Sequence, residues 1–336
     1  MKAVAYRHPL PITAADALLD LTLPDPVATG RELLVRVHAV SVNPVDTKVR
    51  RNAAPPEGQV RVLGFDAAGI VEAVGAQVSL FKPGDRVFYA GALNQRGSNS
   101  ELHCVDERLV GRMPTSLNFA QAAALPLTSI TAWELLFDRL GVTPETTTGA
   151  LLIVGAAGGV GSILTQLARQ LTQLTVIGSA SRDSTQAWVR ELGAHHVVDH
   201  RQPLADELKR IGVPAVTHVA SLTHTEAHYA QIVAALAPQG RLGLIDDPSA
   251  PLDVRLLKSK SLSLHWESMF TRSMFETPDM GAQGALLNRV AELVDAGRLR
   301  STLGEHFGRI NAANLTRAHA AIETASTQGK TVLEGF

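Results

Sequence analysis

The second half of the chain alternates short apolar runs with amphipathic stretches. The apolar runs predict six strands, over residues 151–154, 174–178, 196–198, 216–220, 241–245 and 262–265. The stretches between them have helical spacing over residues 162–171, 183–192, 204–211 and 225–236. Short buried strands joined by helical crossovers form a parallel sheet with helices on its faces. The pattern therefore predicts an α/β fold with a doubly wound parallel sheet.

The first 125 residues follow a different pattern. Alternating or β-branched runs over residues 1–6, 32–39, 67–74 and 86–89 are separated by turns, one of which is Lys82-Pro83-Gly84-Asp85. The tail is predicted to hold a helix with Leu286, Leu287, Val290, Leu293 and Val294 on one face, a helix over residues 312–326 and a strand over residues 330–333. Because 336 residues exceed what one core usually holds, we expect two domains, with the tail returning to a mostly β first domain.

A glycine-rich turn follows the predicted strand at residues 151–154. It reads Gly155-Ala156-Ala157-Gly158-Gly159-Val160-Gly161 and leads into a predicted helix. A strand, a glycine turn and a helix start are typical of a dinucleotide site, because backbone amides can then approach a pyrophosphate at the helix N-terminus. Such a turn is a weak signal alone, and Ala156 replaces its first glycine. We predict cofactor contacts from Ala157, Gly158, Gly159 and Val160.

The next predicted strand ends in Ser179-Ala180-Ser181-Arg182, 18 residues after Gly161. An NAD site would be expected to carry an acid here for the ribose hydroxyls. The small Ala180 leaves room for a 2′-phosphate, and Ser181 and Arg182 offer groups that bind one. We therefore prefer NADPH, with Ser179, Ser181 and Arg182 as contacts. Alternatively, Arg182 only begins the solvent face of the next helix.

Composition excludes several functions. The formal net charge of −1 gives no reason to expect nucleic acid or a membrane surface as a partner. Residues 146–168 carry no charge over 23 positions, but their glycine cluster would break a spanning helix. Cys104 is the sole cysteine, which excludes intrachain disulfides and a Cys-rich metal site and favours a cytoplasmic location.

Several further motifs carry a resemblance over nearly the whole chain. They are Val42-Asn43-Pro44-Val45-Asp46, Gly64-Phe65-Asp66-Ala67-Ala68-Gly69, Phe81-Lys82-Pro83-Gly84-Asp85-Arg86-Val87, Leu125-Pro126-Leu127-Thr128 and Gly329-Lys330. With the glycine turn, they resemble the medium-chain dehydrogenase/reductase superfamily and, within it, the zinc-independent quinone oxidoreductases. The nearest branch is often labelled zinc-type alcohol dehydrogenase-like. The resemblance implies a GroES-like catalytic domain, 1–124 with 267–336, and a Rossmann NADPH-binding domain, 125–266, with a cleft between them.

The resemblance also locates the zinc ligands of the alcohol dehydrogenases, which need two thiolates and a histidine. Asn43 stands in place of the first cysteine, Phe65 in place of the histidine, and no cysteine lies near Pro126 or Leu127. The four-cysteine structural lobe is also missing. The histidine groups 195–200 and 218–228 lack cysteines and, apart from His224 with His228, metal-binding spacing. We predict no metal site.

The resemblance assigns candidate catalytic residues, each with a plainer alternative. Asn43 would donate to the substrate oxygen or fix the nicotinamide, or only shape the turn before Pro44. Asp46 would orient that loop or the nicotinamide ribose, or cap a helix. Lys48 stands where quinone reductases often carry Tyr, so it is either the proton donor or an exposed charge. Thr128 would contact the nicotinamide or cap the helix that continues through Trp133.

Four further residues complete the predicted cofactor site. His200 stands where many relatives have a Tyr against the adenosine phosphate, although it is equally consistent with a surface histidine. Leu222 and Asp246 follow the fourth and fifth predicted strands, at the sheet edge that binds ligands. Lys330 either reaches the cofactor or pairs on the surface.

An apolar run follows the sixth predicted strand and could wall the substrate pocket. It consists of His265, Trp266, Met269, Phe270 and Phe275. For Trp266 and Phe275 we prefer a core or dimer-interface role.

Without zinc, quinones and enones are the plausible hydride acceptors, because hydrogen-bond donors can hold the developing enolate or phenolate. We expect a cytoplasmic NADPH-dependent reductase of such compounds. The alternatives are a zinc-free alcohol or aldehyde reductase, and an NADPH-binding sensor or crystallin-like protein without turnover. The resemblance further implies a homodimer.

Overall fold

The computed structural model describes residues 1–336 as two compact units. Unit 1 combines Met1–Ile130 with Phe270–Phe336, and unit 2 is the single segment Thr131–Met269. The domain boundaries expected from the sequence, 124/125 and 266/267, fall a few residues earlier. In the structure, the first boundary falls between Ile130 and Thr131. This point lies inside helix α3, Pro126–Trp133, so no break in secondary structure marks it.

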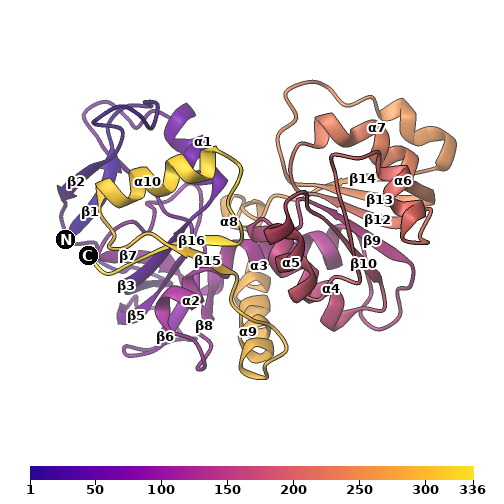
Figure 1. Ribbon diagram of the computed structural model, residues 1–336. Helices are drawn as coiled ribbons and strands as arrows, with labels where there is room; N and C mark the ends of the chain where they lie inside the picture. The colour runs from indigo at the N-terminus through magenta and orange to yellow at the C-terminus, as the bar shows by residue number, and fades with distance from the viewer. The chain divides into compact units, whose positions relative to one another are not determined.

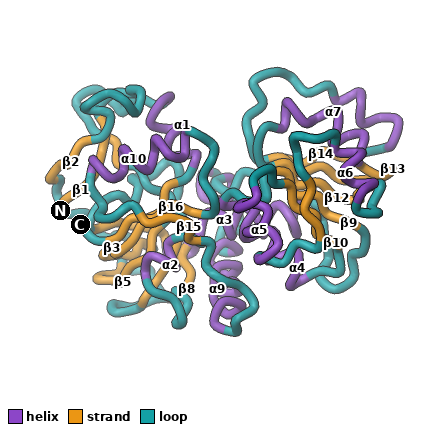
Figure 2. The backbone as a smooth tube through the Cα atoms, viewed as in Figure 1, coloured by secondary structure: helices purple, strands orange, loops and turns teal.

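Unit 2 is built on a six-stranded parallel sheet, shown in orange in Figure 2. In spatial order its strands are β11 (His196–Val198), β10 (Thr175–Ser179), β9 (Ala150–Val154), β12 (Val216–Ser221), β13 (Leu236–Leu244) and β14 (Ser263–Trp266). The strand predicted over residues 241–245 is longer in the structure. Leu236 already pairs with Val216, and the register then shifts so that Arg241 pairs with His218. The doubly wound sheet is confirmed.

Helices cover both faces of this sheet. They are α4 (Gly159–Leu171), α5 (Asp183–Glu191), α6 (Leu204–Arg210) and α7 (Thr225–Ala235), with a π-helical segment, η2 (Glu134–Arg139), and a 3₁₀ segment, η3 (Val254–Lys260). Helices α6 and α7 pack together on the face opposite α4 and α5 (Figure 1). Leu152, Ile177 and Val219 are fully buried in the core beneath them.

The uncharged stretch at residues 146–168 is not a membrane helix. It forms β9, the glycine turn and the first part of α4. None of the helices combines the length and apolarity needed to span a bilayer.

Unit 1 contains two sheets. The three-stranded sheet has the order β2 (Leu19–Thr22), β1 (Lys2–Tyr6), β4 (Arg61–Val62). The larger sheet has the order β15 (Leu303–His306), β16 (Lys330–Glu334), β3 (Glu32–Val42), β5 (Ala67–Val74), β6 (Arg86–Tyr89), β8 (Val110–Arg112), and β7 (Leu102–Asp106) also pairs with β3. The chain tail enters this sheet through β16, in which Thr331 lies opposite Val42 of β3. Residues from both ends of the sequence are thereby brought together.

The helices of unit 1 include α1, which follows β3 directly. The set is α1 (Pro44–Asn52), η1 (Glu107–Leu109), α2 (Phe119–Ala123), α8 (Thr271–Met274), α9 (Ala282–Asp295) and α10 (Ala312–Glu323). Figure 1 shows α10, in yellow, lying along α1. The fully buried guanidinium of Arg50 joins the two helices by donating to Glu323, and it also donates to the Leu10 carbonyl.

The aromatic run near residues 265–275 divides by burial. Met269 and Phe270 are buried, whereas Trp266 is 52% exposed and Phe275 is 74% exposed. A core role for Trp266 and Phe275 is therefore wrong, since both side chains stand largely in solvent.

Candidate functional site

The glycine turn joins β9 to α4 through two positions that only glycine fits. Gly155 has φ +83°, and a Cβ on Gly161 would stand 2.5 Å from the Gly155 carbonyl oxygen. Ser179 of the adjacent strand β10 holds the turn in place. Its hydroxyl accepts from the Gly155 N–H at 3.1 Å, and its carbonyl accepts from the Ala156 N–H at 3.3 Å. Ser179 is buried, so its visible role is to support the turn.

The turn leaves backbone donors at the start of α4. The first intrahelical bond runs from the Ser162 N–H to the Gly158 carbonyl, 2.9 Å. The N–H groups of Gly159, Val160 and Gly161 therefore lie ahead of the helical ladder, at the positive end of the helix dipole. Ala157, Gly158, Gly159 and Val160 are all partly exposed. This geometry can bind a phosphate group.

The end of β10 presents Ser181 and Arg182. Ala180 is buried, Ser181 is partly exposed and Arg182 is exposed. The Arg182 backbone starts α5, because its carbonyl accepts from the Thr185 hydroxyl at 2.9 Å. The helix-start interpretation is thus structurally correct, and it is compatible with phosphate binding because the guanidinium remains on the surface.

The strand order places these groups at the point where the crossovers reverse direction. That point lies between β9 and β12, from which the sheet extends towards β11 on one side and β14 on the other. Leu222, directly after β12, donates its N–H to the Val154 carbonyl at 3.2 Å. Doubly wound sheets bind dinucleotides at this position, outside the carboxyl ends of the strands.

His200 and Asp246 lie in loops at the same sheet edge. His200 is half-buried, and its ring centre stands 6.1 Å from that of His228. Burial is the main cause that lowers the pKa of His200, which favours a neutral ring suited to stacking. Asp246 has both carboxylate oxygens on Thr225, accepting from its N–H at 2.9 Å and its hydroxyl at 2.5 Å. Asp246 therefore anchors the start of α7.

A buried polar network occupies the end of β3 in unit 1. Asp66 Oδ2 accepts from Ser41 Oγ (2.8 Å), Asn43 Nδ2 (2.7 Å) and Lys330 Nζ (3.0 Å), while Asp66 Oδ1 accepts from the Leu127 N–H at 2.7 Å. Lys330 Nζ also donates to Asn43 Oδ1 at 2.5 Å and to the Val42 carbonyl at 3.1 Å. Asn43, Asp66 and Lys330 are exposed by 1%, 0% and 3%. Surface pairing of Lys330 is therefore wrong, because β16 carries it into the interior.

Asp46 supports the same loop from α1. Its carboxylate accepts from the Asn43 N–H at 2.8 Å and from the Gly64 N–H at 2.9 Å. The structure thus shows the capping contact at the start of α1. Burial is the largest influence on Asp46 and raises its pKa to about 7, although the two N–H groups and Lys330 oppose the shift.

Lys48 and Thr128 differ in their surroundings. Lys48 lies on α1 and is exposed. Thr128 is 2% exposed, and its hydroxyl donates to the Leu125 carbonyl at 3.2 Å across the first turn of α3. The hydroxyl thus bonds back to the preceding turn of the chain, and it does not cap a free N–H at the start of α3.

The residues at the zinc-ligand positions do not fit a zinc ion. Asn43 is bound to the Lys330 ammonium, and the Phe65 ring packs edge-to-face on Phe270 with the ring centres 5.4 Å apart. Leu127 contributes only a backbone N–H. The side chains needed for tetrahedral zinc, thiolates and imidazole, are not there. Elsewhere in the chain, no three His, Cys, Asp or Glu side chains lie close enough together to hold a metal ion.

Sequence reasoning missed the role of Asp66, although it recognised the Gly64-Phe65-Asp66 motif. An acid in a motif otherwise made of small and apolar residues was the available signal. A second missed group is a buried carboxyl pair, Glu134 and Glu267, in unit 2. Arg139 Nε donates to Glu267 at 2.9 Å, and Glu134 hydrogen-bonds to Glu267. Nothing in the local sequence pattern marks this pair.

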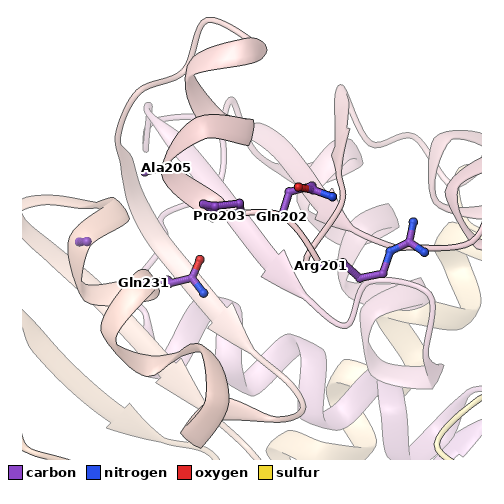
Figure 3. Close-up of a pocket in the computed structure, with 6 residues that line it drawn as sticks. Arg201, Gln202, Pro203, Ala205 and Gln231 are labelled. Carbon is purple, nitrogen blue, oxygen red and sulfur yellow. The ribbon is translucent and has the colours of Figure 1, made fainter.

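A pocket of about 310 Å³ lies beside α6 in unit 2 (Figure 3). Its lining is Arg201, Gln202, Pro203, Ala205, Gln231 and Ala234. The Gln231 side chain accepts from the Leu204 N–H at 2.9 Å, which ties α7 to the start of α6. None of the lining residues belongs to the predicted cofactor set.

The doubly wound sheet, with a glycine turn at its switch point, defines a dinucleotide-binding protein. Residues 29–129 match the alcohol dehydrogenase GroES-like domain, and residues 192–333 match the zinc-binding dehydrogenase family. A zinc-type alcohol dehydrogenase-like protein of Staphylococcus epidermidis is 38% identical, with 99% of each chain covered.

Two solved structures extend the comparison. A Rhizobium etli CFN 42 protein, described provisionally as a zinc-dependent alcohol dehydrogenase, has a TM-score of 0.97 and 58% identity, covering 100% of this chain and 98% of its own. The Escherichia coli quinone oxidoreductase complexed with NADPH has a TM-score of 0.83 and 25% identity, covering 99% and 100%. The chain belongs to the medium-chain dehydrogenase/reductase superfamily. It is an oxidoreductase of that superfamily, which uses a nicotinamide cofactor.

Proposed function

We propose that the protein is a zinc-independent, NADPH-dependent reductase of quinones or α,β-unsaturated carbonyls. The observation that carries the proposal is the buried network of Asn43, Asp66 and Lys330. Asn43 stands where the resemblance locates a ligand cysteine, and its amide is bound to the Asp66 carboxylate and the Lys330 ammonium. This disagrees with the zinc-type names of the relatives, and the donor chemistry of these residues supports the metal-free alternative.

The choice of NADPH rests on the end of β10. The strand ends in Ser179-Ala180-Ser181, none of which is acidic, and the Arg182 guanidinium that follows is on the surface. A guanidinium binds phosphate through paired hydrogen bonds, whereas the ribose hydroxyls of NADH call for an acceptor. The N–H groups of Gly159 and Val160 would bind the pyrophosphate, and Ala157 and Gly158, whose N–H donates to the Gly155 carbonyl, would lie against it. His200 would stack on the adenosine, and Leu222 would border it.

When bound, NADPH supplies the hydride. The chain must then hold the substrate oxygen, on which negative charge develops. Asn43 has one Nδ2 hydrogen on Asp66, and its second is the donor that we assign to this oxygen. Asp46 orients the Asn43 backbone, Thr128 is assigned to the nicotinamide end, and Lys48 stays a predicted proton donor. All three N–H donors of Lys330 go to protein acceptors, so Lys330 has no donor left for the cofactor.

NADPH oxidation by chelator-treated protein tests this function. The acceptors are 1,4-benzoquinone, 9,10-phenanthrenequinone, an enone and a simple aldehyde, each with and without added zinc. Full activity with a quinone or the enone after stripping is expected. Turnover of the aldehyde alone would indicate a zinc-free aldehyde reductase. No NADPH oxidation with any of the four acceptors, with NADPH still bound, would indicate a binding protein. Activity only with zinc would contradict the proposal.

Arg182→Ala tests the cofactor preference. Loss of the guanidinium should raise the KM for NADPH about tenfold or more, because a charge-assisted phosphate contact contributes about 1.5–3 kcal/mol, and should leave NADH nearly unchanged. Arg190→Ala is the matched control, since Arg190 is also exposed on α5. Equal effects of Arg182→Ala on the two cofactors would refute the 2′-phosphate assignment.

We also propose that the protein acts in the cytoplasm as a homodimer, with a small molecule and neither nucleic acid nor membrane as its substrate partner. Strand β14 pairs only with β13, and it carries the half-exposed Trp266. A free strand edge with an exposed aromatic ring can pair with a second copy. Light scattering that gives a monomer mass at working concentrations would exclude the dimer.

A further inference from the structure

The network at the end of β3 contains a cation supplied by the chain itself. Strand β16 pairs antiparallel with β3, with Thr331 opposite Val42, and so brings Lys330 to Asn43. The two residues are 287 positions apart in the sequence. A buried ammonium is costly unless every N–H finds an acceptor. Here the three acceptors are Val42 O, Asn43 Oδ1 and Asp66 Oδ2.

Lys330 and Asp66 together determine how the Asn43 amide is turned. An ammonium only donates, so the side of the amide that faces Lys330 must be Oδ1. An ionised carboxylate only accepts, so the side that faces Asp66 must be Nδ2. The opposite orientation would set Nδ2 against the ammonium and Oδ1 against the carboxylate. The two charged groups thus exclude the flipped amide.

We propose that Lys330 is a positioning residue that, with Asp66, holds the Asn43 amide in the one orientation that leaves an N–H for substrate. This inference rests on the proposed function for its catalytic consequence, but the orientation of Asn43 can be tested without turnover.

A double-mutant cycle tests whether Lys330 acts through Asn43. The variants are Asn43→Ala, Lys330→Met and the two combined, with Lys82→Met as the control because Lys82 is exposed in a turn of unit 1. Removal of one oxyanion donor lowers kcat about 10²-fold or more, so each single variant should lose about that much. The double variant should lose no more than the worse single variant, and the NADPH Kd should be unchanged. Losses that multiply, or a folded Lys330→Met with normal kcat, would overturn the inference.

Loss of Lys330 leaves Asp66 buried without its counter-charge, so Lys330→Met can fail to fold. Lys330→Arg then takes its place in the cycle, because it keeps the positive charge. Any loss of kcat in Lys330→Arg should disappear in the Asn43→Ala background. A loss that persists there would show that residue 330 acts by another route.

The side-chain amide of Asn43 gives a readout independent of activity. In protein labelled with ¹⁵N at asparagine, its two N–H signals are identified by their absence in Asn43→Ala. In the wild type they should be well separated and slow to exchange, and in Lys330→Met or Lys330→Arg they should move. If they move while no acceptor is reduced, the inference stands and the proposed function fails. If the enzyme is active and the signals do not move, the inference fails alone.

Discussion

At the turn between β9 and α4, neighbouring glycines differ in how much room they leave for a side chain. A Cβ on Gly161 would lie 2.5 Å from the Gly155 carbonyl oxygen and 2.6 Å from the Ala156 Cα, both backbone atoms. A Cβ on Gly158 would meet nothing closer than 3.6 Å. Gly161 is therefore required for the packing of α4 on β9. Gly158 is not required for packing, so a side chain at that position would affect only a bound ligand.

Alanine at each position separates these two roles. Gly161→Ala should lower the Tm of the cofactor-free protein by several degrees, because overpacking costs about 1–3 kcal/mol. Gly158→Ala should leave that Tm nearly unchanged and weaken NADPH binding, since its methyl group would stand among the phosphate-binding amides. Thermal unfolding and fluorescence titration measure the two effects. If Gly158→Ala bound NADPH as tightly as the wild type, the pyrophosphate would not lie at this turn.

The elements of unit 2 follow closely from the sequence because their signals are local. The strand at residues 196–198 and the start of the helix at residue 225 agree with the structure, since each depends on periodicity within a few residues. The bonds of Lys330 to Asp66 and Asn43 span 264 and 287 positions. They depend on the pairing of β16 with β3, which local patterning does not specify. The sequence therefore indicated the candidate residues of unit 1 but not their contacts.

The buried carboxyl pair joins η2 to the end of β14. Burial, together with the charge and hydrogen bond of Glu134, raises the pKa of Glu267 to about 9, while Arg139 opposes the shift. The folded protein thus keeps a proton that the unfolded chain releases above the usual pKa of 4.5. Because the folded pKa is the higher one, this stabilisation is present below pH 4.5 and is lost as the pH rises towards 9.

Glu267→Gln should remove this pH dependence. Glutamine cannot release the proton, yet its amide can donate to Glu134 and its oxygen can accept from Arg139. As the pH is raised from 6 to 9, the free energy of unfolding of the wild type should therefore fall relative to that of Glu267→Gln. Urea unfolding at several pH values measures the difference, with Glu292→Gln on the exposed face of α9 as the control. Parallel stability curves for Glu267→Gln and the wild type would show that the pair does not share a proton.

On the scale of the whole molecule, the two units differ in how the chain builds them. Unit 2 is one continuous segment, whereas unit 1 joins the two ends of the sequence. Each unit also has its own buried core, with Leu152 and Val219 in unit 2 and Ala3 and Val62 in unit 1. Unfolding of unit 1 therefore leaves unit 2 as an intact chain segment that can remain folded.

We accordingly expect two calorimetric transitions, and each should respond to a different change. NADPH at 100 times its Kd should stabilise unit 2 by about 2.7 kcal/mol and raise its transition by several degrees. Lys330→Met should lower only the transition of unit 1, because breaking a buried ion pair costs about 3–5 kcal/mol. If both changes instead moved one common transition, the two units would unfold together. The buried lysine would then stabilise the cofactor-binding sheet as well as its own unit.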